Sequence, residues 1–396
     1  MNRKKTVRQA QVKVAVGISG GVDSAVSALL LKKAGYDVVG VHLYCWPPKS
    51  EIERDGLTRE EWIKKNGCRA DEDRASSLKT CLELQIPFKV LDFSEEYNQR
   101  VIKYFYEEYE AGRTPNPDVL CNSEIKFGLF LDWAMKNGFD YIATGHYAKL
   151  MEGDLPLRVP AAPATVGMTK LFIPKDKHKD QTYFLWKLTQ KELGHVLFPL
   201  GDLLKNEVRE IAKEAGLTVA DKKDSQGICF VGNVEVKDFL ARRLKKKEGK
   251  VFDREGNEVG THDGVWFYTI GQRGGWVMDS KTQKLKKSKT QDGETPIFYV
   301  ISKNAERNEL VVAEADGATG DQLEVERLNK ISSTKWKLDD LLVRIRHGGE
   351  LIGARGVEIE SGLLVILDKP VRGIAPGQSA VFYSHEGECL GGGVIV

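Results

Sequence analysis

The chain has 396 residues, a formal net charge of +2 and an apolar content of 41%. This length suggests two or three domains with ample core. No apolar run is long enough to cross a bilayer, so we expect no membrane span. The first eleven residues are basic and polar, which does not fit a secretory signal. The six cysteines are scattered, so we expect a cytoplasmic protein with mostly reduced thiols rather than a disulfide framework.

The first third of the chain alternates between strand and helix patterns. Apolar runs predict strands, and amphipathic stretches predict helices. The expected strands are 12–18, 38–44, 88–93 and 141–145, and the expected helices are 22–34, 70–85, 94–110 and 125–136. This order predicts an α/β domain with a doubly wound, mainly parallel sheet, whose ligands bind beyond the carboxyl ends of the strands.

The pattern changes in the second half of the chain. Residues 151–170 predict a surface excursion, and helical patterns return at 182–188 and 206–215. Short alternating strands then dominate, as in a small β-barrel. They are expected at 265–270, 297–301, 309–313, 341–346, 356–360, 363–367 and 379–383. We therefore predict a catalytic domain at 1–230, a small linking domain at 231–295 and a C-terminal β-barrel domain at 296–396.

A glycine-rich loop joins the first predicted strand to the first predicted helix. Its residues are Gly17, Ile18, Ser19, Gly20, Gly21, Val22, Asp23 and Ser24. The helix start offers N–H groups and roughly half a positive charge to an anion. Gly20 and Gly21 let the main chain approach a phosphate, and the carboxylate of Asp23 can hold Mg²⁺. The loop is neither a Walker A loop nor a dinucleotide fingerprint. It resembles the loop of the N-type ATP pyrophosphatases, which implies cleavage of ATP between the α and β phosphates.

Two cysteines are candidates for thiol chemistry. Cys121 is expected just ahead of a helix, where the helix dipole favours the thiolate. Asp118, three residues earlier, could act as acid, base or orienting group. Cys229 follows a flexible glycine turn, and Lys222 and Lys223 favour its thiolate. Taken alone, each cysteine also fits a buried structural residue in a turn.

Two basic runs, 242–250 and 281–289, lie in the C-terminal half. Each run fits a solvated surface or a surface for a phosphate-rich polymer.

Taken together, these segments resemble the tRNA-specific 2-thiouridylases of the MnmA and TrmU type. The matching segments are GISGGVDS, AGRTPNPDVLCN, IKF, YIATGHYA, KDQTYFLW, DSQGICF, TIGQR, APGQSAVFY and CLGGG, in the family's order from residue 17 to 393. The resemblance implies adenylation of the C2 oxygen of the wobble uridine by ATP, followed by sulfur transfer from a cysteine persulfide to give 2-thiouridine. The implied partners are tRNA for Lys, Glu and Gln and a sulfur donor, either a cysteine desulfurase or a relay protein; we expect a monomer.

The resemblance also implies roles for individual residues. The loop 17–24 would bind ATP with help from Leu43 and Gly145. Cys121 would be the nucleophile and Cys229 the persulfide carrier. Cys121 would either attack the persulfide and close a disulfide with Cys229, or assist the addition directly. The residues expected at the tRNA are Asn116, Pro117, Asp118, His146, Lys179, Asp180, Gln181, Arg346, His347 and Gln378. No residue is assigned to a resident metal site. The chain departs from the family at Leu43, where relatives often have Met, and at His347, where some have an aromatic residue.

Three alternatives stay open from the sequence. Another ATP pyrophosphatase, such as an amidating ligase or an argininosuccinate synthetase-like enzyme, would share the loop but would not need two loop cysteines. Asp118, Cys121 and Cys229 could instead hold an iron–sulfur cluster. A tRNA-binding protein without catalysis is the third alternative. The persulfide route needs Cys229 to reach the ATP site, so we predict that residues 220–232 are mobile and order on tRNA binding.

Overall fold

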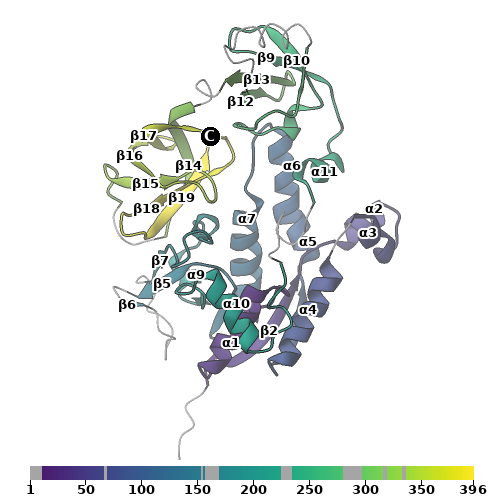
Figure 1. Ribbon diagram of the computed structural model, residues 1–396, viewed down its shortest axis with the longest axis vertical. Coiled ribbons are helices and arrows are strands. Elements are labelled where there is room, and N and C mark those ends of the chain that lie inside the picture. Colours follow the sequence, from purple (N-terminus) through teal and green to yellow (C-terminus); the bar gives the residue numbers. More distant parts are fainter. Residues whose placement is uncertain are drawn as a thin grey trace, which may run out of the picture. The chain divides into compact units, whose positions relative to one another are not determined.

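The computed structural model describes residues 11–66, 69–152, 155–156, 169–223, 234–279, 297–314, 319–331 and 336–396. The chain divides into two compact units (Figure 1). The first unit contains Met1–Glu95, Asn122–Thr182 and Leu188–Gln226, and the second contains Glu96–Cys121, Tyr183–Lys187 and Gly227–Val396. Among the helices in the described ranges, none is both long and apolar enough to cross a membrane.

A five-stranded sheet forms the centre of the first unit. Its strands lie in the order β3 (Phe88–Asp92), β2 (Asp37–Tyr44), β1 (Lys13–Gly17), β4 (Tyr141–Ala143) and β8 (Val196–Leu197). Every neighbouring pair is parallel, which confirms the predicted doubly wound sheet. The strand order reverses between β1 and β4, and such a switch point is where open α/β sheets bind ligands. The Gly17–Ser24 loop begins there.

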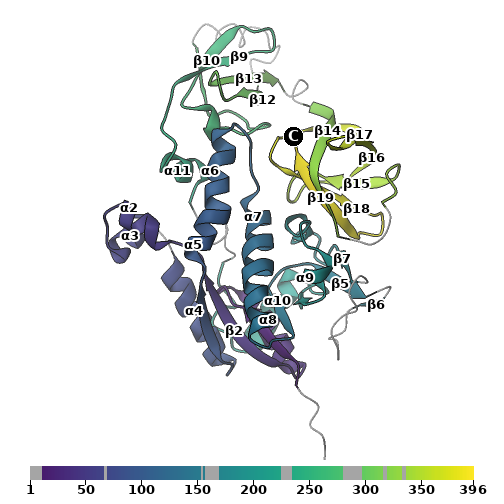
Figure 2. The same cartoon turned by 180° about the vertical axis from the view of Figure 1, so that it is seen from behind.

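Helices cover both faces of this sheet. Val14 and Val16 of β1 belong to the same buried cluster as residues of α1 (Val22–Lys33) and α10 (Lys205–Glu214). These two helices lie in front of the sheet in Figure 1. The opposite face carries α8 (Phe130–Lys136), which is in front in Figure 2; Phe130 lies 3.6 Å from the position of a Cβ on Gly17. The strands are apolar on both faces because both faces are covered.

The remaining elements up to residue 223 are mostly short. They are α2 (Lys49–Arg54), α3 (Arg59–Asn66), α4 (Ala70–Glu83), α5 (Ser94–Tyr97), η1 (Asn98–Ile102), α6 (Lys103–Glu110), α7 (Pro117–Leu120), η2 (Cys121–Leu129), β5 (Lys149–Glu152), β6 (Leu155–Pro156), β7 (Thr169–Phe172), η3 (Thr182–Phe184) and α9 (Gln190–Leu193). The predicted helix at 94–110 is confirmed as α5, η1 and α6. Of the predicted helix at 182–188, only the single turn η3 is present, so the prediction is wrong for residues 185–188.

The second unit contains a five-stranded sheet and a closed barrel. The sheet has the order β11-β10-β9-β13-β12, and the barrel has the order β14-β17-β16-β15-β18-β19. The sheet strands are β9 (Gly249–Phe252), β10 (Glu258–His262), β11 (Val277–Met278), β12 (Phe298–Asn304) and β13 (Glu309–Glu314), with helix α11 (Val236–Ala241) before them. The barrel strands are β14 (Thr319–Lys330), β15 (Leu341–Arg344), β16 (Ile352–Ile359), β17 (Gly362–Arg372), β18 (Ser379–Tyr383) and β19 (Cys389–Ile395).

One predicted strand of this region is wrong, and the strand pairing bears on the domain limit. The predicted strand at 265–270 is the 3-10 turn η4 (Val265–Phe267), because Gly264 turns the chain with φ +135° and the N–H of Val265 bonds to the Asn308 side chain. β13 pairs with β9, so residues after 296 complete the sheet of the middle domain. We therefore propose that the C-terminal domain begins between β13 and β14 rather than at residue 296.

Candidate active site

The Gly17–Ser24 loop leaves the carboxyl end of β1 and enters α1. Gly21 is the N-cap, so no side chain caps the helix, and the first N–H groups of α1 have no partner within the helix. The Ser24 hydroxyl closes the loop, since it accepts a hydrogen bond from the N–H of Ser19 at 3.1 Å and lies 3.2 Å from the Ser19 hydroxyl. The result is a short loop at an uncapped helix start, which offers backbone N–H donors to an anion.

Two glycines allow close approach of the backbone at this loop. Gly20 has φ +77°, and a Cβ there would lie 2.6 Å from the carbonyl oxygen of Asp73 in α4. A Cβ on Gly145, just after β4, would lie 2.7 Å from the N of Ser24 and 2.8 Å from the carbonyl carbon of Asp23. Real side chains do not fit at such distances, so both positions require glycine. The structure thus places Gly145 against the start of α1.

Lys205 brings a positive charge to the loop. Its Nζ lies 2.7 Å from each carboxylate oxygen of Asp23, and Asp23 also accepts a hydrogen bond from the Tyr147 hydroxyl at 2.9 Å. The Lys205 side chain is only 13% exposed, so the charge is held in a partly desolvated position. A second lysine, Lys222, donates to the carbonyl of Gly20 and to Asp73, both at 2.9 Å.

The sequence analysis missed this role of both lysines. Lys222 and Asp73 are 149 residues apart in the chain, and Lys205 and Asp23 are 182 apart. No spacing rule relates residues so distant. The available signal was the position of Lys205 at the start of an amphipathic helix.

Leu43 and His146 lie at the carboxyl edge of the same sheet. Leu43 is the penultimate residue of β2, and its side chain is buried. His146 is also buried, with its Nδ1 2.7 Å from the Thr144 hydroxyl and its ring centroid within 6.0 Å of those of Phe127 and Phe198. Burial lowers the pKa of His146 well below its ordinary value, and the charge of Lys126 lowers it further. The imidazole is therefore neutral at physiological pH.

The predicted tRNA residues 179–181 are tied to their surroundings. The carboxylate of Asp180 is buried and accepts hydrogen bonds from the N–H and the hydroxyl of Thr182 at 2.9 and 2.7 Å. The side-chain oxygen of Gln181 accepts from the N–H of Tyr147 at 2.8 Å. Lys179 is half-buried, and its N–H bonds to the carbonyl of Asp176. This segment is a connection of fixed conformation.

The segment 113–121 belongs to the second unit. Asn116 is the N-cap of α7 and Pro117 its first residue, so the helix begins four residues before Cys121. The prediction that Cys121 stands just ahead of a helix is therefore wrong. Its N–H already bonds to the carbonyls of Asp118 and Pro117, and its side chain is fully buried. Asp118, in the first turn of α7, lies one helical turn from Cys121.

Three further predicted residues belong to the barrel. Arg346 and His347 are exposed directly after β15, and the His347 ring lies 4.4 Å from that of Phe184. Gln378 is half-buried and donates hydrogen bonds to the carbonyl oxygens of Thr114 and Pro115. Cys229 and most of the predicted mobile segment 220–232 lie outside the described residues.

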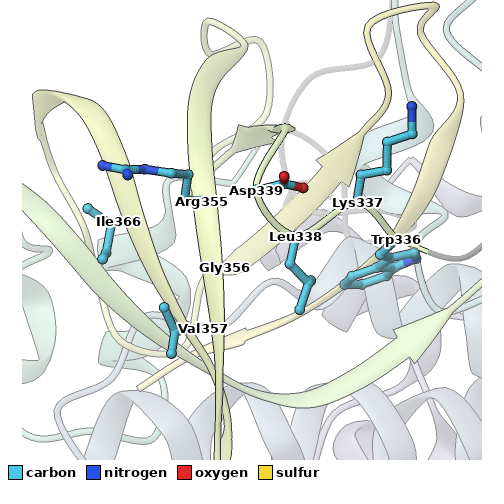
Figure 3. A pocket seen from close by; sticks show the side chains of 8 residues that line it. All are labelled: Trp336, Lys337, Leu338, Asp339, Arg355, Gly356, Val357 and Ile366. Carbon is cyan, nitrogen blue, oxygen red and sulfur yellow. The ribbon is translucent and has the colours of Figure 1, made fainter.

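A separate open depression of about 810 Å³ lies on the outside of the barrel (Figure 3). Trp336, Leu338 and Val357 are apolar residues of its lining, and Lys337, Asp339 and Arg355 add charges of both signs. None of the predicted site residues lines it.

Comparisons with known proteins identify the family. Residues 12–233 match the family described as the tRNA methyl transferase HUP domain, residues 237–314 its PRC-barrel domain, and residues 320–395 the aminomethyltransferase beta-barrel domain. A tRNA-specific 2-thiouridylase MnmA of Lysinibacillus sphaericus is 40% identical over 405 residues, which cover 99% of this chain and 96% of that protein. The chain belongs to the tRNA-specific 2-thiouridylase family. Other family members agree over similar lengths: the protein of Lactobacillus delbrueckii subsp. bulgaricus is 40% identical over 98% of this chain and 96% of its own length, and that of Bacillus licheniformis is 39% identical over the same shares.

The family's domain limits fit the strand pairing in the second unit. The second match ends with β13 at residue 314, and the third begins at residue 320, within β14. Among solved structures, a 4-thiouridine synthetase in complex with RNA and bound ATP covers 58% of this chain and 50% of its own, at 17% identity and a TM-score of 0.32. That likeness is too low to carry an argument.

Proposed function

We propose that the protein is a tRNA-uridine 2-sulfurtransferase that activates a uridine with ATP and replaces its C2 oxygen by sulfur. The observation that carries the proposal is the glycine-dependent anion loop with Lys205 beside Asp23, in a chain that matches 2-thiouridylases over nearly its whole length. An uncapped helix start and a partly desolvated lysine suit the triphosphate of ATP. The thiol of Cys121, one helical turn from Asp118, would take part in the sulfur chemistry.

The loop fits ATP and magnesium in its donor groups. Backbone N–H groups and the hydroxyls of Ser19 and Ser24 would contact phosphate oxygens. The carboxylate of Asp23 is a hard oxygen ligand of the kind that Mg²⁺ prefers, and phosphates would complete the coordination. When bound, Mg²⁺ would neutralise charge on the departing pyrophosphate. Lys205, held 2.7 Å from Asp23, would add a further positive charge at the same place.

The reaction needs a leaving group and a sulfur nucleophile. The uridine O2 attacks the α phosphate of ATP, pyrophosphate leaves, and the C2 oxygen becomes part of an AMP leaving group. The terminal sulfur of a persulfide on Cys229 attacks C2, and AMP departs. The thiolate of Cys121 then attacks the inner sulfur of Cys229, which leaves the terminal sulfur on the base and closes a Cys121–Cys229 disulfide. An external thiol reduces the disulfide.

The finer parts of the proposal concern substrates and contacts. The substrates would be the wobble uridines of tRNA for Lys, Glu and Gln, and the donor a cysteine desulfurase or a relay protein. The exposed side chains of Arg346 and His347 are available to the tRNA. An anticodon base is already in a single-stranded loop, so its extrusion into the site costs little.

Thiolation of an anticodon stem-loop in vitro tests the proposal. Wild type, Cys121→Ser and Cys229→Ser would be incubated with ATP, Mg²⁺ and a persulfide source, and both 2-thiouridine and pyrophosphate would be measured. We expect neither variant to form 2-thiouridine, while pyrophosphate release persists because adenylation does not need the thiols. Absence of RNA-dependent pyrophosphate release from wild type would refute the proposal. Thiolation by Cys229→Ser would refute the persulfide step.

A further inference from the structure

Within the second unit, the C-terminal barrel contacts the loop that precedes Cys121. The 114–118 loop comprises the end of the connection between α6 and α7 and the first two residues of α7, Pro117 and Asp118, while the barrel segment 375–378 lies between β17 and β18. The N–H of Thr114 donates to the carbonyl of Pro376 at 2.8 Å. The side-chain Nε2 of Gln378 donates to the carbonyl of Thr114 at 2.9 Å and to that of Pro115 at 3.2 Å. Segments more than 260 residues apart in the chain are therefore joined by backbone groups and one amide.

The close approach of the two segments depends on a glycine. Gly377 has φ +92°, and a Cβ there would lie 2.9 Å from the carbonyl oxygen of Thr114 and 3.0 Å from its N. The barrel segment is itself fixed by the last strand, since the N–H of Gly377 donates to Ile395 and the N–H of Ile395 donates to Gln378, both at 2.8 Å. The support under the loop is therefore a rigid part of the barrel.

A second connection runs through a buried tyrosine. The Tyr183 hydroxyl donates to the carbonyl of Ser379 at 3.0 Å and hydrogen-bonds the side chain of Asn116. Asn116 occupies the N-cap position of α7, which carries Asp118 and ends just before Cys121. The barrel thus fixes the start of this helix on both sides of Pro115.

We propose that Gln378 is a positioning residue, which holds the 114–118 loop so that Asp118 and Cys121 stand in their reactive arrangement. The proposal rests on the proposed function for its catalytic consequence, but not for the coupling itself. Proline residues at 115 and 117 remove two backbone donors from the loop. The carbonyls of Thr114 and Pro115 instead receive their hydrogen bonds from the Gln378 amide. The sequence analysis predicted Gln378 as a tRNA contact. A tRNA contact would affect the Kd for tRNA, whereas a positioning residue would affect kcat.

The test uses Gln378→Met and Gln378→Glu, which both keep the side-chain length but remove the N–H donor. The control is Gln322→Met, an exposed glutamine on β14 of the same barrel. We expect kcat for thiolation to fall by about 10- to 100-fold in both Gln378 variants, as small displacements of reacting groups do. The Kd for tRNA should stay within about twofold of wild type, and melting temperatures would verify folding.

A second measurement needs neither ATP nor RNA. Because Cys121 is fully buried, an alkylating reagent reaches it only when the loop opens. The rate of iodoacetamide labelling of the Cys121 peptide, followed by mass spectrometry, should rise about tenfold in the Gln378 variants. This change corresponds to a decrease of about 1.4 kcal/mol in the free energy of opening of the loop. It should be unchanged in Gln322→Met.

Each outcome decides between the two roles. A raised Kd for tRNA, with unchanged kcat at saturation and unchanged labelling, would make Gln378 an RNA contact and overturn the proposal. Unchanged kcat and labelling would overturn it as well. Faster labelling in a protein that lacks thiolation activity would support the coupling and count against the proposed function alone.

Discussion

Replacement of Lys205 by methionine tests whether the loop is an ATP phosphate site. The substitution keeps the unbranched aliphatic side chain but removes the charge that lies 2.7 Å from both oxygens of Asp23. A charge-assisted hydrogen bond to an anion is worth about 1.5–3 kcal/mol. We therefore expect kcat/KM for ATP to fall about 10- to 150-fold. Asp23 keeps its hydrogen bond from the Tyr147 hydroxyl, so the fold should persist.

RNA-dependent pyrophosphate release, measured over a range of ATP concentrations, provides the assay. Lys213→Met is the matched control, since Lys213 lies on the same helix and its ion pair with Glu210 is about half exposed. An exposed pair of this kind contributes little, so the control should retain activity within about twofold. Equal kcat/KM for ATP in Lys205→Met and wild type would refute the assignment of Lys205 to the phosphates.

Three further predictions concern the surroundings of the loop. Gly145→Ala should abolish ATP-dependent pyrophosphate release, because its Cβ would enter the backbone at Ser24, whereas Gly194→Ala, with neighbours no nearer than 3.5 Å, should be active. Lys222→Met should lower ATP affinity by about tenfold in a binding titration, because it removes the donor to the Gly20 carbonyl and the partner of Asp73. His146→Gln should flatten the pH dependence of urea unfolding below about pH 6.5. The pKa of His146 is lower in the folded protein than in the unfolded chain. Below about pH 6.5, the unfolded chain therefore binds a proton at His146 that the folded protein does not bind. The free energy of unfolding of the wild type then decreases by up to about 1.4 kcal/mol for each unit by which the pH falls. An unchanged slope in the variant would contradict this prediction.

The parts of the fold that sequence analysis predicted well have local causes. β1, β2 and β4 are short apolar runs, and α1 follows a glycine turn, so periodicity and turn residues suffice. The parallel sheet follows from the order of these elements. The segment Val265–Phe267 was misassigned because alternation alone does not distinguish a half-buried strand from a turn whose first and third residues are buried. The helix start at Pro117 was missed because the predicted helix began at residue 125, although proline is favoured in the first turn of a helix.

The site itself was predictable only where the backbone limits the choice of residue. Glycines at 20 and 145 are required by contacts of 2.6 and 2.7 Å, and a glycine-rich turn after a strand is visible in the sequence. Lys205 and Gln378 act through hydrogen bonds across more than 180 residues, and no spacing in the sequence pairs either residue with its partner. Their partners become known only once α10 packs on α1 and the barrel closes.

The two proposed chemical steps, adenylation and sulfur transfer, depend on different parts of the fold. The groups proposed for adenylation lie at the edge of one sheet, within a single unit, and their geometry depends on contacts among β1, β4, α4 and α10. The groups before Cys121 depend instead on the barrel, through Pro376 and Gln378. Perturbation of the barrel should therefore impair sulfur transfer while adenylation persists, so that pyrophosphate is released without 2-thiouridine. Because the barrel segment is fixed by β19, the last strand of the chain supports the thiol loop more directly than its place in the sequence suggests.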